Sequence, residues 1–204
     1  MEISTIVFDF GNVLIGWDPR RVYRQTLGTD DAIARFFEEV GFAGWNLEQD
    51  RGGRSWSEAV AELAARFPHR QELIRAFDER WEESITGPIE GTVRIVERLH
   101  KSGYRLIGLT NWSAEKFALT MPRYEVFKQF DDIVVSGDVR LVKPDPEIFQ
   151  LMLRRIGSDA GECLFIDDSA ANITAAARIG FRTIHFQSPA QLERDLEAQG
   201  ITLS

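Results

Sequence analysis

Residues 3–12 read Ile-Ser-Thr-Ile-Val-Phe-Asp-Phe-Gly-Asn. The first six are mostly β-branched or apolar, which is typical of a strand buried on both faces. Gly11 and Asn12 favour an irregular turn directly after this strand. The segment therefore predicts a core strand that ends at Asp9, where a carboxylate leaves the apolar interior.

From about residue 88 onward, apolar runs alternate with helical patterns. Four further short strands are predicted at 106–109, 132–135, 163–166 and 182–186. The segments between them carry apolar residues at helical spacing, as Phe149, Met152 and Ile156 show. This alternation predicts an α/β fold, a doubly wound parallel sheet with helices on both faces. We assign residues 1–16 and 88–204 to this core domain.

Residues 17–87 break the alternation. They hold helical patterns at about 30–40, 56–67 and 73–81 and no convincing strand, and Ser55 with Glu58 forms a possible capping box. We expect an all-helical cap domain inserted over residues 17–87.

Composition narrows the classes of protein that the chain fits. Apolar residues make up 44% of the 204 residues, and 24 basic against 32 acidic residues give a net charge of −8. An acidic chain without a basic stripe is not expected to bind nucleic acid or an anionic membrane. No apolar run approaches the roughly 20 residues of a membrane span, and Cys163 as the single cysteine excludes an internal disulfide. The first residues lack the features of a secretion signal, so we expect a monomeric, cytoplasmic protein.

Polar side chains gather where the predicted strands end. Parallel strands present these ends at one edge of the sheet, where ligands bind. The residues are Asp9, Thr110, Asn111, Asp167 and Asp168, with Lys143 in the loop after the third strand. Three carboxylates at one edge repel one another unless a cation lies between them, and oxygen ligands favour Mg²⁺ over zinc. A lysine and a hydroxyl beside that cation would bind a phosphate-like dianion.

These residues resemble the motifs of the haloacid dehalogenase superfamily, and the resemblance covers essentially the whole chain. Four motifs follow one another in the expected order: Phe8-Asp9-Phe10-Gly11-Asn12-Val13-Leu14, Leu109-Thr110-Asn111, Lys143-Pro144 and Phe165-Ile166-Asp167-Asp168. The helical insertion lies where this superfamily places its small helical cap. Four motifs in order, each at a predicted strand end, make the resemblance specific.

The resemblance implies a Mg²⁺-dependent phosphatase acting on a small phosphorylated metabolite. Asp9 would be the nucleophile that attacks phosphorus and forms an aspartyl phosphate. Thr110 and Lys143 would stabilise the transferring phosphoryl group. The implied Mg²⁺ ligands are Asp9, the carbonyl of Gly11, Asp168 and, either directly or through an outer contact, Asp167.

The sequence departs from the superfamily at Gly11. Most phosphatases of the superfamily carry a second aspartate there, two residues after the nucleophile, which protonates the leaving group. General acid–base help is typically worth about 10²–10⁴-fold in rate. Either the leaving group departs easily without protonation, or a residue elsewhere in the chain supplies the proton. The Asp-x-Gly-Asn-Val pattern resembles a sugar-1-phosphate phosphatase subgroup, whose leaving group needs less protonation.

Three other functions are weighed against the sequence, and the second of them is nearly excluded. A 2-haloacid dehalogenase would use the same Asp9 on carbon without a metal, although its motifs usually carry an aromatic residue at the position of Gly11 and a Ser-Asn fourth motif. A phosphonate-cleaving enzyme would need a cap lysine, and residues 17–87 contain none. A phosphate-binding module without turnover would have no use for the nucleophile.

The cap offers few readable substrate contacts. Residues 45–53 form its least helical stretch, placed like the loop that similar enzymes lower over the active site. Within that stretch Trp45 and Arg51 are candidate substrate-binding residues, together with Asn111 of the core. Trp17 and Trp112 either line the pocket or pack in the core. Trp56 and Trp81, which follow helical stripes, are predicted to be core residues.

Overall fold

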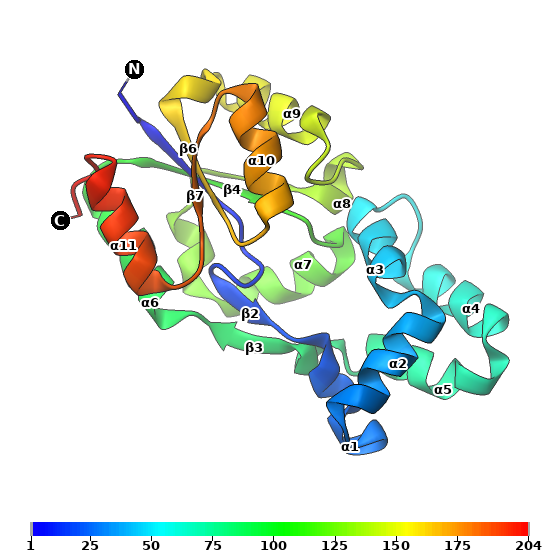
Figure 1. Cartoon of the computed structure of the whole chain (residues 1–204). Coiled ribbons are helices and arrows are strands. Elements are labelled where there is room, and N and C mark those ends of the chain that lie inside the picture. Colours follow the sequence, from blue (N-terminus) through cyan, green and yellow to red (C-terminus); the bar gives the residue numbers. More distant parts are fainter. Residues whose placement is uncertain (1, 204) are drawn as a thin grey trace.

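The computed structural model describes residues 2–203, which fold into two lobes (Figure 1). The larger lobe is built on five parallel strands in the order β5-β4-β1-β6-β7. Their bounds are β1 Thr5–Phe8, β4 Arg105–Thr110, β5 Asp132–Val135, β6 Cys163–Asp167 and β7 Arg182–His185. The predicted doubly wound α/β core is confirmed, because each predicted strand is present and all neighbouring pairs are parallel.

Helices cover both faces of this sheet. Because alternate side chains of a strand point to opposite faces, Val7 packs with Phe149 and Met152 in one apolar cluster, while Ile6 and Phe8 belong to another. The helices of the core lobe are α6 Glu90–Lys101, α7 Ala114–Thr120, α8 Ser136–Val139, α9 Pro146–Ile156, α10 Ala170–Ile179 and α11 Pro189–Ala198. Short 3-10 turns lie at Met121–Arg123 (η4), Glu125–Gln129 (η5) and Ala160–Glu162 (η6). Within residues 2–203, no helix combines the length and apolarity that crossing a membrane requires.

The second lobe is helical and lies between two short strands. Its helices are α1 Arg24–Leu27, α2 Asp30–Val40, α3 Phe42–Arg51, α4 Trp56–Arg66 and α5 Gln71–Glu79, with 3-10 turns at Pro19–Tyr23 (η1), Pro68–Arg70 (η2) and Trp81–Ser84 (η3). The strands β2 Ile15–Trp17 and β3 Ile85–Pro88 pair antiparallel and connect the lobes. The sequence did not predict them, because three or four residues are too few to show an alternating pattern.

Residues 45–53, predicted to be the least helical stretch of the insertion, are helical over most of their length, because α3 continues to Arg51. Gly44 and Asn46 lower the intrinsic helix propensity of this segment. Packing overrides that preference: Phe42 stacks on Phe37 with ring centroids 4.1 Å apart, and Trp45 meets Trp56 edge-on at 5.6 Å. The capping box predicted before α4 is present.

Gly108 on β4 is a position where the fold tolerates no side chain. A Cβ atom there would lie 2.3 Å from Cζ of Phe10, whose buried ring is held by Phe127 and Phe130 at centroid distances of 4.9 and 5.0 Å. We expect Gly108→Ala to lower the free energy of unfolding by about 1–3 kcal/mol, since overpacking forces such a core to shift. Chemical denaturation measures this change.

Gly44→Ala is the matched control, because a Cβ at this helical position meets nothing within 4 Å. It should raise the free energy of unfolding by about 0.5–1 kcal/mol through helix propensity. Equal effects of the two substitutions would contradict the packing argument.

Candidate active site

The order of the strands places the candidate residues in one crevice. β1 lies at the centre of the sheet, with β4 on one side and β6 on the other. The chain adds β4 and β5 on one side of β1 and then β6 and β7 on the other side, so the strand order reverses at β1. Open α/β sheets bind ligands at this switch point, beyond the carboxyl ends of the strands. Asp9 follows β1, Thr110 ends β4 and Asp167 ends β6. The amide of Asp9 donates to the carbonyl of Ile166 at 2.9 Å, which ties the first turn to β6.

The turn after β1 is tightly closed. Asn12 has a left-handed backbone conformation (φ 55°), which asparagine tolerates better than most residues. Its side-chain oxygen accepts a hydrogen bond from the amide of Trp17 at 2.9 Å. This turn leads the chain from Asp9 directly into β2 and the helical lobe.

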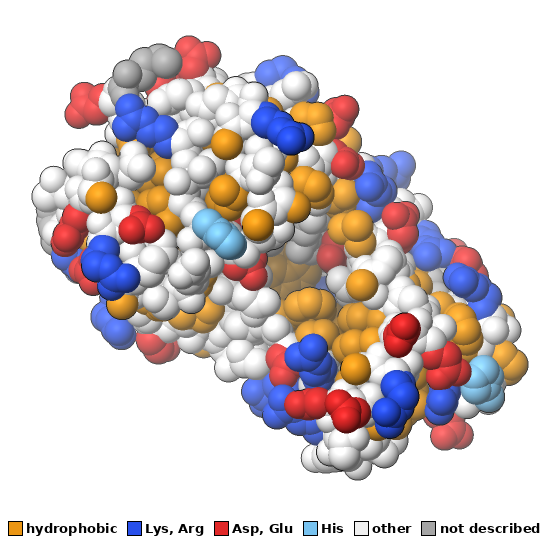
Figure 2. All heavy atoms as spheres, in the orientation of Figure 1, with side chains coloured by type: hydrophobic (Ala, Val, Ile, Leu, Met, Phe, Trp, Pro, Cys, Tyr) orange, Lys and Arg blue, Asp and Glu red, His pale blue; other side chains and the backbone are white. Residues whose placement is uncertain are grey.

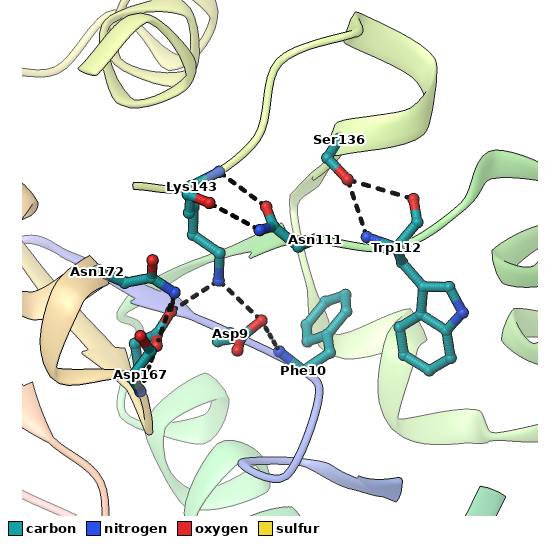
Figure 3. Close-up of polar contacts among 9 residues, drawn as sticks. Asp9, Phe10, Asn111, Trp112, Ser136, Lys143, Asp167 and Asn172 are labelled. Carbon is teal, nitrogen blue, oxygen red and sulfur yellow. Dashed lines mark hydrogen bonds and ion pairs between the residues drawn. The ribbon is translucent and has the colours of Figure 1, made fainter. Parts of the chain in front are cut away.

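Lys143 lies at the centre of the charged cluster (Figure 3). Its Nζ is 2.9 Å from Oδ1 of Asp9 and 2.7 Å from Oδ2 of Asp167, and its side chain is 1% exposed. The amide of Phe10 also donates to Oδ1 of Asp9, at 2.7 Å. A buried ammonium is therefore held between two carboxylates that would otherwise repel each other.

Asn111 fixes the backbone at Lys143 from the end of β4. Its Nδ2 donates to the carbonyl of Lys143 at 2.9 Å, and its Oδ1 accepts from the amide of Lys143 at 2.8 Å. Both ends of this side-chain amide are thereby engaged. In the structure, Asn111 supports the backbone of Lys143. The substrate contact that the sequence suggested for Asn111 stays a prediction.

Asp167 is held by the protein on both of its carboxylate oxygens. Oδ1 accepts from the amide of Ser169 at 2.8 Å, and Nδ2 of Asn172 lies 3.0 Å from each oxygen. Asp168 by contrast is exposed, and its backbone carbonyl lies 2.9 Å from Nε2 of His185. Asp168 is thus the freer of the two acids.

The electrostatics follow from burial. Burial raises the pKa of Asp9 from 3.8 to about 7, and Lys143 opposes this rise only in part. Burial also acts to lower the pKa of Lys143, but the carboxylates of Asp9 and Asp167 outweigh it and hold that pKa above its usual value. Burial, followed by the charge of Asp167, raises the pKa of Asp168. The cluster thus sets three carboxyl groups around a single lysine.

The cluster fits a hard divalent cation. Asp9, Asp167 and Asp168 each offer a carboxylate oxygen, and these atoms lie within 4.8 Å of one another. Oxygen-only donors of this kind suit Mg²⁺. Beside them, Oγ1 of Thr110 is fully buried without a hydrogen-bond partner among the described residues. A buried orphan hydroxyl costs free energy unless a ligand satisfies it, and a phosphoryl oxygen would do so.

A pocket of about 70 Å³ lies next to this cluster, between the lobes. Four tryptophans line it: Trp17, Trp56, Trp81 and Trp112. Its polar lining residues are Asn46, Asp50, Asn111, Ser113 and Lys116, with Gly11 at the side of the cluster. We call it the tryptophan pocket. Trp56 and Trp81, predicted to be core residues, are buried and also face this pocket.

The tryptophan pocket adjoins a wider groove on the surface. The two share Trp17, Asn46 and Asp50, and the groove continues past Asn12 and Leu47. Figure 2 shows this side of the molecule hollowed between the lobes, with hydrophobic side chains inside the hollow. We call the wider hollow the outer groove. It gives a molecule of metabolite size a route to the pocket.

The two cap residues predicted to bind substrate lie elsewhere. Trp45 is 9% exposed inside the helical lobe, where its indole N–H donates to the carbonyl of Ala59 at 3.3 Å, and it does not line the tryptophan pocket. Arg51 also lies outside the pocket lining and pairs with Asp145 of the core lobe at 3.3 Å. In this structure Trp45 packs the helical lobe, and Arg51 connects that lobe to the loop after Lys143.

Sequence reasoning missed Asp50 and Lys116. Burial raises the pKa of Asp50 to about 7, against the lowering effect of the Ser113 amide, and the charge of Asp9 raises it further. Nζ of Lys116 pairs with Asp78 at 2.5 Å and lies 4.9 Å from the ring centre of Trp56. For Asp50, the sequence did contain a signal: Asn46 and Asp50 are spaced i,i+4, which places them on one polar face of a helix.

A parallel α/β core, an acidic crevice at its switch point and a helical lobe above it define a hydrolase of the Rossmann-like kind. Residues 3–180 match the haloacid dehalogenase-like hydrolase family. Since this match covers most of the chain, the protein belongs to the haloacid dehalogenase-like hydrolases.

Two relatives illustrate the range of this family. The chain is 25% identical over 199 residues to drimenol cyclase drtB of Aspergillus calidoustus, covering 95% of this chain and 36% of that protein. It is 24% identical over 193 residues to pyrophosphatase PpaX of Halalkalibacterium halodurans, covering 90% of this chain and 83% of that protein. The chain thus spans about a third of the cyclase and most of the pyrophosphatase.

Solved structures share the fold. A HAD-like family hydrolase from Porphyromonas gingivalis superposes with a TM-score of 0.76 at 27% identity, covering 96% of this chain and 98% of that chain. The HAD family enzyme bt-2542 from Bacteroides thetaiotaomicron, solved in complex with magnesium and inorganic phosphate, gives a TM-score of 0.67 at 22% identity, covering 91% and 95%. The second likeness, at its low identity, concerns the fold alone.

Proposed function

We propose that this hydrolase is a Mg²⁺-dependent phosphatase that transfers the phosphoryl group of a small metabolite to Asp9. The observation that carries the proposal is the buried cluster of Asp9, Lys143 and Asp167, with the orphan hydroxyl of Thr110 and the freer carboxylate of Asp168 beside it. Asp168 supports phosphatase over 2-haloacid dehalogenase chemistry, because the latter needs no metal and leaves this acid without a role.

The chain's own residues account for the phosphoryl transfer. Lys143 and the Phe10 amide hold Oδ1 of Asp9, which orients the carboxylate and leaves Oδ2 to attack phosphorus. Oγ1 of Thr110 donates to one phosphoryl oxygen, and Lys143 stabilises the negative charge that the phosphoryl group brings. The bond from phosphorus to the leaving oxygen breaks as the bond to Asp9 forms. Water then hydrolyses the aspartyl phosphate to release inorganic phosphate.

Asp9, Asp168 and the Gly11 carbonyl would hold Mg²⁺, and Asp167 would either be a further direct ligand or act from outside the ligand set by holding Lys143. When bound, the cation would supply charge neutralisation between the carboxylates and the phosphoryl oxygens. The hydrogen bonds that engage Asp167 on both oxygens favour the outer role for that residue.

The helical lobe would act as a cap. We propose residues 17–87 as this cap and residues 1–16 and 88–204 as the core, with β2 and β3 as the connection between them. The cap as so bounded contributes three of the four indoles of the tryptophan pocket, Trp17, Trp56 and Trp81, and its closure would exclude bulk water from Asp9. The indoles suit a leaving group with an apolar face, which a sugar ring offers. A sugar phosphate is therefore the substrate class we favour, in keeping with the Asp-x-Gly-Asn-Val pattern.

The expected result of a first assay is release of inorganic phosphate from an aryl phosphate and from sugar-1-phosphates, with Mg²⁺ and not with excess chelator. Loss of the cation leaves the carboxylates of Asp9 and Asp168 to repel a phosphate dianion, so chelation should remove nearly all activity, and added Mg²⁺ should restore it. A phosphate-release assay with and without chelator measures this.

Equal phosphate release with and without chelator would contradict the role of the cation. No phosphate release from any substrate, together with halide release from 2-haloacids, would replace the proposed phosphatase by a dehalogenase.

A further inference from the structure

Gly11 carries no group that can exchange a proton, and a carboxyl group from the opposite lobe lines the same pocket. We propose that Asp50 of α3 is the general acid–base residue, protonating the leaving-group oxygen and later activating the hydrolytic water. The inference rests on the phosphatase function proposed above and extends it to the step that Gly11 leaves without a catalyst.

The position of Asp50 is fixed by contacts on both carboxyl oxygens. Oδ1 accepts from the amide of Ser113 at 3.1 Å, and Oδ2 accepts from Nδ2 of Asn46 at 3.0 Å. Each oxygen therefore makes one hydrogen bond and keeps one site for a proton or a further partner. Ser113 lies three residues after Thr110, so the same loop positions both the phosphoryl-binding hydroxyl and the proposed acid.

The backbone around Asp50 is docked on the core lobe. Oγ of Ser136 donates to the carbonyl of Asp50 at 2.6 Å and itself accepts from the amide of Trp112 at 2.8 Å (the latter drawn in Figure 3). Gly52 approaches α8 so closely that a Cβ atom would lie 2.6 Å from the carbonyl oxygen of Gly137. These contacts hold the backbone of Asp50 against the core lobe, although Asp50 belongs to the cap.

Asp50 lines the pocket that would hold the leaving group. It borders both the tryptophan pocket, which Gly11 also lines, and the outer groove through which a product can depart. Its carboxyl is near enough to the carboxylate of Asp9 to feel that charge. The other charged groups near it are Lys116, which is paired with Asp78, and Arg51, which is paired with Asp145.

The surroundings favour a carboxyl group that exchanges a proton near neutrality. Burial is the largest cause of the raised pKa of Asp50, which lies at about 7. A group with such a pKa can serve as acid in one step and as base in the next. An ordinary exposed aspartate would be almost wholly ionised at the same pH.

Asp50 gives up one proton in the first step and regains one in the second. The O–H proton of Asp50 moves to the bridging oxygen while that oxygen's bond to phosphorus breaks and the bond from Asp9 to phosphorus forms. The leaving group departs as an alcohol, and Asp50 remains as a carboxylate. Asp50 then takes a proton from the water that attacks the aspartyl phosphate. Inorganic phosphate and the free carboxylate of Asp9 result, and Asp50 is again protonated.

The test is Asp50→Asn, which keeps an oxygen to accept from Ser113 and removes the acid. We expect kcat/KM to fall about 10²–10⁴-fold for alkyl phosphates, whose leaving groups need a proton, and to change less than about 3-fold for an activated aryl phosphate. Because kcat/KM covers only the steps up to leaving-group departure, the hydrolysis step does not mask this contrast. Binding of inorganic phosphate with Mg²⁺ should be unchanged.

Gly11→Asp supplies the second arm. A Cβ at Gly11 meets nothing within 4 Å, so the substitution fits, and the backbone carbonyl is kept. In the Asp50→Asn background it should restore at least part of the lost kcat/KM for alkyl phosphates. Glu72 is an exposed acid on α5 of the same lobe, so Glu72→Gln is the control and should leave kcat/KM unchanged for both kinds of substrate.

An equal loss for both kinds of leaving group, or no loss for either, would overturn the role of Asp50 while the phosphatase stands. Wild-type protein without Mg²⁺-dependent phosphate release would instead overturn the proposed function itself. The two failures are therefore distinguishable.

Discussion

Asp9→Asn is expected to lower the rate of phosphate release by at least about 10⁴-fold, because the substitution removes the nucleophile and no other carboxylate occupies its place at the end of β1. The amide keeps an oxygen that can accept from Phe10 and Lys143, so the turn after β1 should be unchanged. The measurement is phosphate release with saturating Mg²⁺, at substrate concentrations above and below KM.

The stability of this variant distinguishes loss of chemistry from loss of fold. Burial raises the pKa of Asp9 from 3.8 to about 7 in the folded protein, so the folded state binds this proton more tightly than the unfolded chain does. Ionised Asp9 therefore opposes folding above about pH 7 when no cation is bound. At pH 8 with chelator, Asp9→Asn should unfold at the same or higher denaturant concentration than wild type. Asp31→Asn, at an exposed position of α2, is the control for activity. Wild-type-like turnover by Asp9→Asn would contradict the mechanism.

Lys143→Met is expected to lower the free energy of unfolding by about 3–5 kcal/mol in chelator, the usual effect of leaving a buried charge without its partner. Lys143 is 1% exposed and bridges Asp9 and Asp167, whose side chains are 11% and 0% exposed. Methionine fills much of the same space and leaves two buried carboxylates facing each other. Urea denaturation with and without Mg²⁺ measures the change, and the cation should recover part of it.

Two further variants separate this effect from the simple loss of a lysine. Lys128→Met breaks the ion pair with Glu125, where both side chains are more than 70% exposed, and should change stability by less than about 0.5 kcal/mol. Asp167→Asn in the Lys143→Met background should restore part of the stability, because it removes one of the unpaired charges. A Lys143→Met protein as stable as wild type would show that the cluster does not depend on its ammonium.

The strands of the core lobe could be predicted because their β propensity, their apolar pattern and the residues that end them all point to the same structure. Ile6, Val7 and Phe8 combine β propensity with burial, and Asp9 and Gly11 mark the end of the strand. The residues of the charged cluster followed from the same reasoning, since parallel strands bring their carboxyl ends together. Placing Asp9, Thr110 and Asp167 in one crevice needed no knowledge of side-chain contacts.

The cap was less predictable for a physical reason. Its α3 contains the poor helix formers Gly44 and Asn46, and it depends on the packing of Phe42 and Trp45 against rings from other helices, which no local pattern shows. Which polar residues of α3 reach the pocket depends on how the lobe docks on Ser113 and Ser136. The sequence therefore suggested Arg51 as a pocket residue, whereas its neighbour Asp50 lines the tryptophan pocket.

The most direct test of the account is to look for the phosphoryl group on Asp9 during turnover. A single-turnover reaction with Mg²⁺ is quenched in acid within milliseconds, digested and analysed by mass spectrometry. We predict that the peptide containing Asp9 gains the mass of one phosphoryl group, that this species disappears as free phosphate forms, and that Asp9→Asn never shows it. Phosphate release in which Asp9 stays unmodified at every quench time, or in which another residue carries the phosphoryl group, would contradict the central claim.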